Sequence, residues 1–215
     1  MTEILSTTAG DLPLEEVTLE CAGRSWSILH TGAMISYADE RAFLGSEAAA
    51  VRPYGIVLWP AAIALAQELA TRDLRGKRVL ELGAGTGLPG MVARHRGATV
   101  VQTDRQNLVL HVCKLNAARN QIDVEQKLAD WTEWTDTTKY DVIIGSDILY
   151  AAGLHPALRA IFDGNLAPGG QLIIADPFRE ASMPLFQAMQ DAGWAVAFDK
   201  WTFEGRPVGV FSLSR

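Results

Sequence analysis

The chain is poor in cysteine and has no long apolar run. Only Cys21 and Cys113 occur among its 215 residues, too few for a disulfide framework or a cysteine metal site. The four histidines lack the spacing of metal ligands, so we expect no metal site. No apolar stretch approaches the roughly 20 residues that a membrane-spanning helix requires. The first 16 residues are acidic and lack an apolar core, unlike a signal peptide, so we expect a cytoplasmic protein that does not bind membranes.

Basic residues are scarce in the first quarter of the chain. Residues 1–50 contain two basic and eight acidic side chains, and this imbalance accounts for the whole net charge of −6. Such a cluster can simply be a solvated surface. The alternative, which has a functional meaning, is a surface that attracts a basic partner. Because phosphate binding needs a basic stripe and the sequence has none, nucleic acid is disfavoured as a partner.

The segment from Arg78 to Gly90, RVLELGAGTGLPG, is the most informative stretch. A short apolar run meets an acid and three alternating glycines, which is typical of a strand, a tight turn and a helix that bring the backbone close to a nucleoside. Seventeen residues after Gly87, a second apolar run ends in Asp104. An acid at the tip of the second strand is placed to accept hydrogen bonds from ribose hydroxyls. Together these features predict a bound nucleoside.

From Gly76 onward, strand and helix patterns alternate. Strands are expected at 78–82, 98–103, 122–128, 140–146 and 170–175, and helices at 88–95, 106–119, 154–165 and 181–192. This alternation predicts an α/β fold, a Rossmann-like, doubly wound parallel sheet with helices on both faces. Two further strand-like runs, 194–203 and 208–214, are close enough to form a hairpin, so we expect the last strand to enter the sheet antiparallel.

The region before this alternation has its own pattern. Residues 15–30 predict a β-hairpin that turns at Ala22-Gly23, residues 36–50 a short helical stretch, and residues 59–71 a helix with Pro60 in its first turn. We therefore expect one domain over 1–215, with an N-terminal hairpin and cap region at 1–52 and the Rossmann-like core at 53–215.

The glycine spacing, Glu81-Leu82-Gly83-Ala84-Gly85-Thr86-Gly87, resembles that of class I, seven-stranded S-adenosylmethionine-dependent methyltransferases. A dinucleotide fingerprint, the alternative, has its third glycine one residue later, and its pyrophosphate would be repelled by the acid. Other segments resemble methyltransferase family 16, the small protein lysine methyltransferases and their bacterial relatives: Leu58-Trp59-Pro60, Leu88-Pro89-Gly90, Asp130-Trp131 and Ser146-Asp147-Ile148-Leu149-Tyr150. The resemblance covers roughly residues 15–215. It implies a seven-stranded sheet and S-adenosyl-L-methionine as cofactor.

The resemblance also implies which residues bind this cofactor. Asp104 would bind the ribose, and Trp59 would cap the methionine end unless it is simply buried against the sheet. Trp131 would lie beside the adenine with Asp130 near its exocyclic amine, although Trp134 is a competing aromatic. The full expected set is Trp59, Glu81, Gly83, Gly85, Gly87, Asp104, Asp130, Trp131 and Ser146.

Asp147 and Tyr150 are the implied catalytic residues, since the family's D-x-x-Y pattern is intact. An amine attacks a methyl group only when it is neutral, whereas free lysine has a pKa of about 10.4. A carboxylate and a phenol can accept, desolvate and orient such an amine. The alternative is that Asp147 caps the next helix. Residues 176–179 follow the fifth strand on the same rim, where they would either help to shape the acceptor pocket or form an ordinary turn. Asn116 lies where the family often has asparagine, and helix packing explains it equally well.

The leading hypothesis is an S-adenosylmethionine-dependent N-methyltransferase that acts on a lysine side chain of a protein. A small-molecule N-methyltransferase for an amine or nicotinamide-like base is the alternative, and a non-catalytic nucleoside-binding scaffold is a third. A protein acceptor needs an open groove beside Tyr150. A metabolite needs a lid, for which residues 31–53 are the candidate segment.

Overall fold

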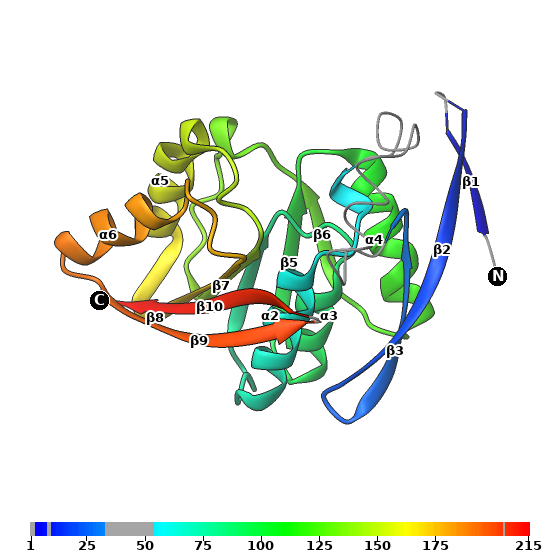
Figure 1. The fold of residues 1–215 in the computed structure, drawn as a ribbon, viewed down its shortest axis with the longest axis horizontal. Helices are drawn as coiled ribbons and strands as arrows, with labels where there is room; N and C mark the ends of the chain where they lie inside the picture. Colours follow the sequence, from blue (N-terminus) through cyan, green and yellow to red (C-terminus); the bar gives the residue numbers. More distant parts are fainter. Residues whose placement is uncertain (1–2, 8–9, 33–53, 204) are drawn as a thin grey trace.

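The computed structural model describes residues 3–7, 10–32, 54–203 and 205–215. These residues form a small three-stranded sheet and a large seven-stranded sheet, which lie on either side of helix α4 (Asn107–Arg119) in Figure 1. The helical stretch expected at 36–50 lies outside the described residues. Within them, no helix is both long and apolar enough to cross a membrane.

The large sheet has the strand order β6-β5-β4-β7-β8-β10-β9. Its strands are β4 (Arg78–Leu82), β5 (Thr99–Asp104), β6 (Glu125–Leu128), β7 (Tyr140–Ser146), β8 (Leu166–Asp176), β9 (Ala195–Phe203) and β10 (Arg206–Ser214). The pairs from β6 through β8 are parallel, whereas β10 runs antiparallel to both β8 and β9. This confirms the predicted Rossmann-like sheet with its antiparallel terminal strand.

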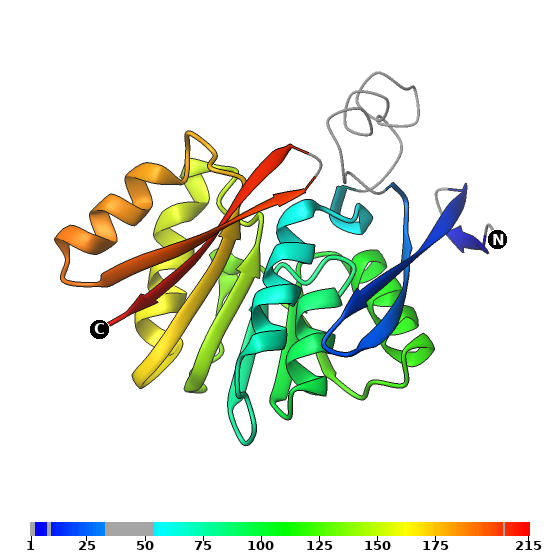
Figure 2. The same cartoon turned by 60° about the horizontal axis from the view of Figure 1, so that its bottom comes forward.

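Helices cover both faces of this sheet (Figures 1 and 2). Helices α2 (Pro60–Thr71), α3 (Leu88–His95) and α4 cover one face, while α5 (His155–Asn165) and α6 (Met183–Asp191) cover the other. Burial on both faces explains why the central strands are almost continuously apolar, as in residues 142–145 of β7. These helices and strands match the sequence-based predictions to within a few residues, except for β6 and β8.

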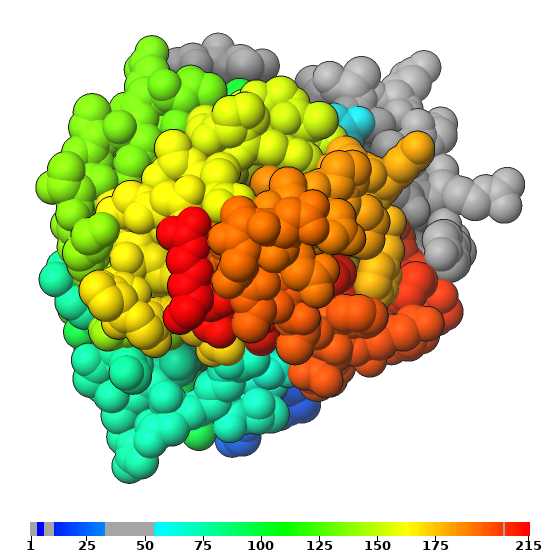
Figure 3. Space-filling model, turned by 90° about the vertical axis from the view of Figure 1, so that its left-hand side faces the viewer, coloured from blue at the N-terminus to red at the C-terminus, as the bar shows by residue number. Residues whose placement is uncertain are grey.

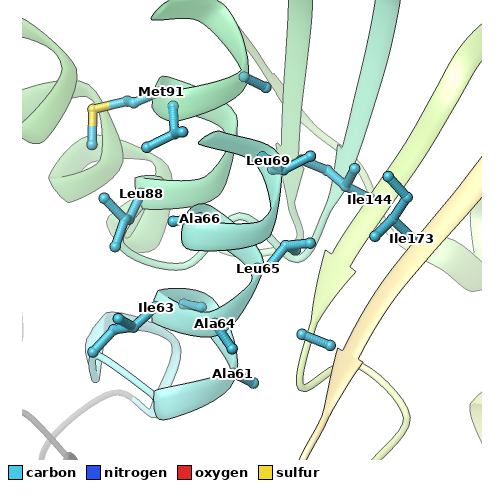
Figure 4. Packing of buried hydrophobic residues seen from close by; sticks show 14 of the residues in the cluster. Ala61, Ile63, Ala64, Leu65, Ala66, Leu69, Leu88, Met91, Ile144 and Ile173 are labelled. Carbon is cyan, nitrogen blue, oxygen red and sulfur yellow. The ribbon is translucent and has the colours of Figure 1, made fainter. Parts of the chain in front are cut away.

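Helix α2 packs beside α3 and against the sheet. It begins at Pro60, where a missing N–H is harmless, and its apolar residues are buried nearly all the way round. Figure 4 shows Leu65 and Leu69 directed at the sheet residues Ile144 and Ile173. The predicted helix at 59–71 is therefore confirmed. Its side chains are buried on more sides than the one apolar face that the sequence predicts.

The terminal hairpin packs beneath α6. Phe186 of α6 stacks on Phe211 of β10, with ring centroids 4.0 Å apart. Figure 3 shows α6 and the end of β10 side by side on this face. Gly205, at φ 85°, lies in the turn between β9 and β10. This aromatic contact fixes the hairpin against the helix layer formed by α5 and α6.

The N-terminal sheet is larger than the predicted hairpin. Strands β2 (Gly10–Cys21) and β3 (Arg24–His30) pair as expected around Ala22 and Gly23, both at positive φ. Strand β1 (Glu3–Thr7) adds to the other edge of β2, and Ile4 lies opposite Pro13. Proline cannot donate to a strand ladder and so argues against a strand, which is why the pattern before residue 15 did not predict one.

Strand β8 starts four residues before the expected Gly170, and β6 is shorter than the expected 122–128. The register between β7 and β8 shifts between Tyr140 and Val142, and Gly169 there has a φ of 72°. This irregularity lets the Ala167-Pro168-Gly169-Gly170 stretch stay within the sheet. Proline and paired glycines normally indicate a loop, so the sequence pattern placed the strand start too late.

Replacement of Leu65 by alanine tests the core position of α2. Leu65 is fully buried, so Leu65→Ala should lower the free energy of unfolding by about 2–5 kcal/mol through lost burial and an unfilled cavity. The matched control is Leu128→Ala, at a side chain that is 55% exposed, which should cost about 0.5 kcal/mol or less. Urea denaturation measures both. Equal costs would contradict the assigned packing of α2.

Candidate active site

A cavity of about 450 Å³ opens at the carboxyl ends of β4, β5 and β7. Open parallel sheets bind ligands at this edge, where the strand order reverses. Most residues of the predicted site line it: Trp59, Gly83, Gly85, Asp104, Asp130, Trp131, Ser146, Asp147 and Tyr150. Glu81 and Gly87 of the predicted cofactor set do not line it. Tyr54, Thr86 and Arg179, which were not in that set, do.

The glycine loop after β4 forms the cavity floor. Gly83, Gly85 and Gly87 all have positive φ, at 65°, 55° and 83°. A side chain at Gly85 would approach the Gly55 carbonyl oxygen to 3.0 Å, and one at Gly83 would approach the Trp131 ring to 3.3 Å. The positive φ favours glycine at all three positions, and the limited space at Gly83 and Gly85 adds to this preference.

Asp104, the last residue of β5, faces this loop. Its carboxylate accepts hydrogen bonds from the N–H groups of Gly85, at 3.4 Å, and Gln106, at 3.1 Å. Burial raises the pKa of this carboxyl above its ordinary value. Asp104 is thus held at the cavity wall by the loop itself, in the position expected for a ligand of ribose hydroxyls.

Glu81 supports the loop from the side away from the cavity. The Gln102 amide donates to Glu81 Oε2 at 2.6 Å and to the Gly87 carbonyl at 2.9 Å. Burial raises the pKa of Glu81 to about 8, and its Oε1 has no hydrogen-bond partner among the described residues. A buried carboxyl with one unpaired oxygen is most stable when neutral. Glu81 therefore supports the glycine loop and does not line the cavity.

Asp130 and Trp131 form the wall beyond β6. The Asp130 carboxylate accepts hydrogen bonds from the N–H and hydroxyl of Thr132, which lower its pKa. The Trp131 ring covers Gly83. Trp134, the competing aromatic, instead donates to Asn165 and lines a neighbouring hollow. Of these two tryptophans, only Trp131 faces the cavity.

Trp59 lies immediately before α2, as its N-cap residue. It is half-buried, and its indole N–H donates to the Tyr54 carbonyl at 3.3 Å. Its ring lines the cavity, so the alternative of a tryptophan buried against the sheet does not describe this side chain.

Asp147 follows β7 with a φ of 55°, a conformation that few residues other than glycine adopt. Its N–H donates to the Ala175 carbonyl at 2.8 Å, which ties the turn to β8. The next helical turn begins only at Ala152, with Ala151 as its N-cap, so Asp147 does not cap a helix. Backbone strain held at a cavity edge is typical of functional residues.

The Asp147 carboxylate forms a two-pronged ion pair with Arg179. Arg179 Nε lies 2.6 Å from Oδ1 and Nη2 lies 2.8 Å from Oδ2. Arg179 is itself positioned by Asp176, whose carboxylate accepts the Arg179 N–H and the Ser182 hydroxyl. The sequence pattern places residues 176–179 on this rim but does not predict the pair with Asp147. The signal for this pair in the sequence is an acid after β7 and an arginine after β8, because these two strands are neighbours.

Comparison with known proteins now bears on this site. The family model of lysine methyltransferases matches residues 43–191. The chain belongs to this family. Protein N-lysine methyltransferase METTL21A of Danio rerio is 38% identical over 128 residues, which cover 55% of the chain and 58% of that protein. Histone-arginine methyltransferase METTL23 of Xenopus laevis is 38% identical over 106 residues, 45% of each protein. The chain thus matches about half the length of these curated relatives.

The fold comparison agrees. The 16S rRNA N2 G1207 methyltransferase RsmC of Thermus thermophilus, solved with S-adenosylmethionine and guanosine, has a TM-score of 0.63 at 17% identity. The match covers 100% of the chain and 58% of that structure. At this identity the likeness shows the fold alone.

The cavity residues fit S-adenosylmethionine, the methyl donor of this family. The bare glycine backbone leaves room for close approach, Asp104 offers an acceptor for hydroxyls, and Trp131 offers an aromatic surface for a purine. Trp59 and Ser146 line the same space. The individual contacts of these side chains with the donor remain predictions.

The assignment of Asp104 predicts a specific loss of donor binding. Asp104→Ala removes a charged hydrogen-bond acceptor, so we expect calorimetry to show S-adenosylmethionine affinity weakened by about 1–3 kcal/mol, roughly five- to 150-fold. Asp199→Ala, at an exposed carboxyl on β9, should leave the affinity unchanged. Unaltered binding in Asp104→Ala would remove Asp104 from the donor site.

The buried carboxyl of Glu81 predicts a pH-dependent stability. Its pKa rises on folding, so the folded state holds the proton more tightly than the unfolded chain does. The resulting contribution to the free energy of unfolding is fully present below the ordinary pKa and is lost as pH rises towards about 8. Glu81→Gln is neutral at every pH. The Tm of the unaltered protein should therefore fall relative to that of Glu81→Gln between about pH 5 and pH 8. A constant difference in Tm would contradict a raised pKa.

Proposed function

We propose that this protein is an S-adenosylmethionine-dependent N-methyltransferase that methylates a lysine side chain of a protein substrate. Membership of the lysine methyltransferase family supports the reaction class. The observation that carries the proposal is the Asp147–Arg179 pair: a carboxylate at the edge of the donor cavity already binds a cationic nitrogen group. The acceptor nitrogen would take the place of the Arg179 guanidinium on Asp147.

The bound donor supplies a methyl group that is carried on a sulfonium. When a nitrogen attacks this methyl group, the sulfur leaves as a neutral thioether. The protein's part is to deliver a neutral, oriented amine. Asp147 accepts a hydrogen bond from the amine and aims its lone pair, and Tyr150 lines the same cavity. A lysine that arrives as an ammonium first releases one proton to water, which frees the lone pair. The N–C bond then forms as the C–S bond breaks, and the methylated nitrogen takes over the positive charge that leaves sulfur.

The charges around the cavity suit a cationic acceptor. Asp104, Asp130 and Asp147 line it, against Arg105 and Arg179. The side chain of Asp147 is only 9% exposed, whereas that of Arg179 is 37% exposed and reaches solvent. An incoming cation can therefore displace the guanidinium outward, while the carboxylate stays in position.

The described part of the rim favours a protein over a small metabolite, and the candidate lid at 31–53 lies outside the described residues except for its first two. Tyr54 and Tyr150 both line the cavity, and each is 51% exposed, which leaves an apolar rim accessible to a polypeptide. Of the acidic first quarter, the described carboxylates of Glu16 and Glu20 bond to Ser27 and Ser25 on β3 and do not line the cavity. Support for a basic partner thus comes from the cavity carboxylates.

An arginine acceptor is the second candidate. Asp147 binds the Arg179 guanidinium with both carboxylate oxygens, the geometry with which a substrate arginine would also bind. A curated relative is named as a histone-arginine methyltransferase. Both candidates use the Asp147 carboxylate, and the family description favours lysine over arginine. The two candidates predict different products.

Incubation of the protein with tritiated S-adenosylmethionine and a lysate of its source cells tests the function. We expect label in a discrete protein band, and acid hydrolysis of that band should release methyl-lysine. Methyl-arginine in the hydrolysate would favour the second candidate. Label confined to the small-molecule fraction would replace the protein acceptor by a metabolite. No transfer to any fraction would contradict the enzyme and favour a donor-binding scaffold.

Asp147→Asn separates chemistry from donor binding. The amide keeps the shape but loses the charge and one acceptor, so transfer should fall on the order of a hundredfold or more. Calorimetric affinity for S-adenosylmethionine should change little. Asp191→Asn, at an exposed position ending α6, is the matched control and should retain full activity. Undiminished turnover in Asp147→Asn would exclude the proposed role.

A further inference from the structure

Asn116 of α4 and Asn120, the C-cap residue that follows this helix, act in place of a neighbouring strand along the outer edge of β3. Asn120 accepts from the Ser27 N–H at 3.0 Å and donates to the Ser27 carbonyl at 2.7 Å. Asn116 does the same at Leu29, at 2.7 Å and 3.0 Å. Four residues of helix rise about 6 Å and two residues of strand about 6.8 Å, so the two spacings match.

The two amides differ in their remaining N–H. In Asn120 it donates to the Asn116 carbonyl of α4, at 2.8 Å. In Asn116 it donates to the Thr86 carbonyl, at 2.9 Å. Both side chains are buried, and each uses both amide hydrogens and its oxygen. Only Asn116 therefore joins the N-terminal sheet to the glycine loop.

Thr86 is the residue in the loop that most needs such a tie. It lines the donor cavity, is buried, and lies between Gly85 and Gly87, both at positive φ. Glycines on both sides leave its peptide groups free to rotate unless a hydrogen bond fixes them. The Asn116 bond fixes the carbonyl of the Thr86–Gly87 peptide, and the Gly87 N–H donates to Ala84 at 2.8 Å.

We propose that Asn116 is a positioning residue that couples the N-terminal sheet to the methyl-donor site. Ordering of β3 holds the Asn116 amide, the amide holds the Thr86 carbonyl, and the loop then has the shape that the donor needs. Coupling between two sites is reciprocal, so donor binding must also stabilise β3. The inference depends on donor binding and not on the identity of the acceptor.

Asn120→Ala is the matched control for Asn116→Ala. Each removes one amide that bonds to β3, so both should lower the Tm. S-adenosylhomocysteine affinity, measured by calorimetry, should fall by about fivefold or more in Asn116→Ala and by less than about twofold in Asn120→Ala. Asn116→Asp keeps the acceptor for Leu29 but has no N–H for Thr86, so it should bind as weakly as Asn116→Ala. Equal effects of Asn116→Ala and Asn120→Ala on affinity would overturn the proposal.

Amide hydrogen exchange tests the reciprocal effect in the unaltered protein and in both variants. S-adenosylhomocysteine should slow exchange in β3 of the unaltered protein and of Asn120→Ala, but not of Asn116→Ala. A purely structural asparagine would not produce this ligand-dependent difference. If the unaltered protein binds the ligand and β3 exchange does not respond, the coupling is wrong. If it binds no S-adenosylhomocysteine at all, the donor assignment fails together with the coupling. A protein that binds it but methylates nothing leaves the coupling standing.

Discussion

The chain passes from β4 into α3 through three residues at positive φ, Gly83, Gly85 and Gly87. This backbone path is unfavourable for other residues and is held from several sides. The Thr103 carbonyl accepts the Ala84 N–H, Gln102 holds the Gly87 carbonyl, and helix α4 holds that of Thr86. Because these contacts come from β5 and α4, the cavity floor depends on the packing of the surrounding layers.

The position of Asp147 and Arg179 at the cavity edge follows from the same topology. Strands β4 and β7 are neighbours, so the glycine loop after one and Asp147 after the other open into a single cavity. Asp147, like the glycines, has a positive φ, and its turn is tied to β8. The rim after β8 then brings Arg179 onto its carboxylate. The glycine loop, Asp147 and Arg179 are adjacent because three adjacent parallel strands end at the same edge.

Much of this arrangement follows from sequence patterns. The glycine spacing, the acid at 104 and the strand–helix alternation predicted the parallel sheet and its cavity, because each is a local signal with one structural solution. The contacts that support the site were not predictable: Gln102, Asn116 and Arg179 act on partners 15, 30 and 32 residues away. Pro13 concealed a strand because its pairing with Ile4 overrode the local preference of proline. The glycines at 169–170 concealed the start of β8 because they lie in a register shift between pairs of β7 and β8.

A crystal structure of the protein with S-adenosylhomocysteine tests most directly whether the glycine-loop cavity is the donor site that faces the acceptor. The account predicts the ribose hydroxyls on Asp104, the adenine against Trp131, and the sulfur on the side of the cavity that holds Asp147. A nucleoside bound elsewhere, or one whose sulfur lies away from Asp147, would contradict it.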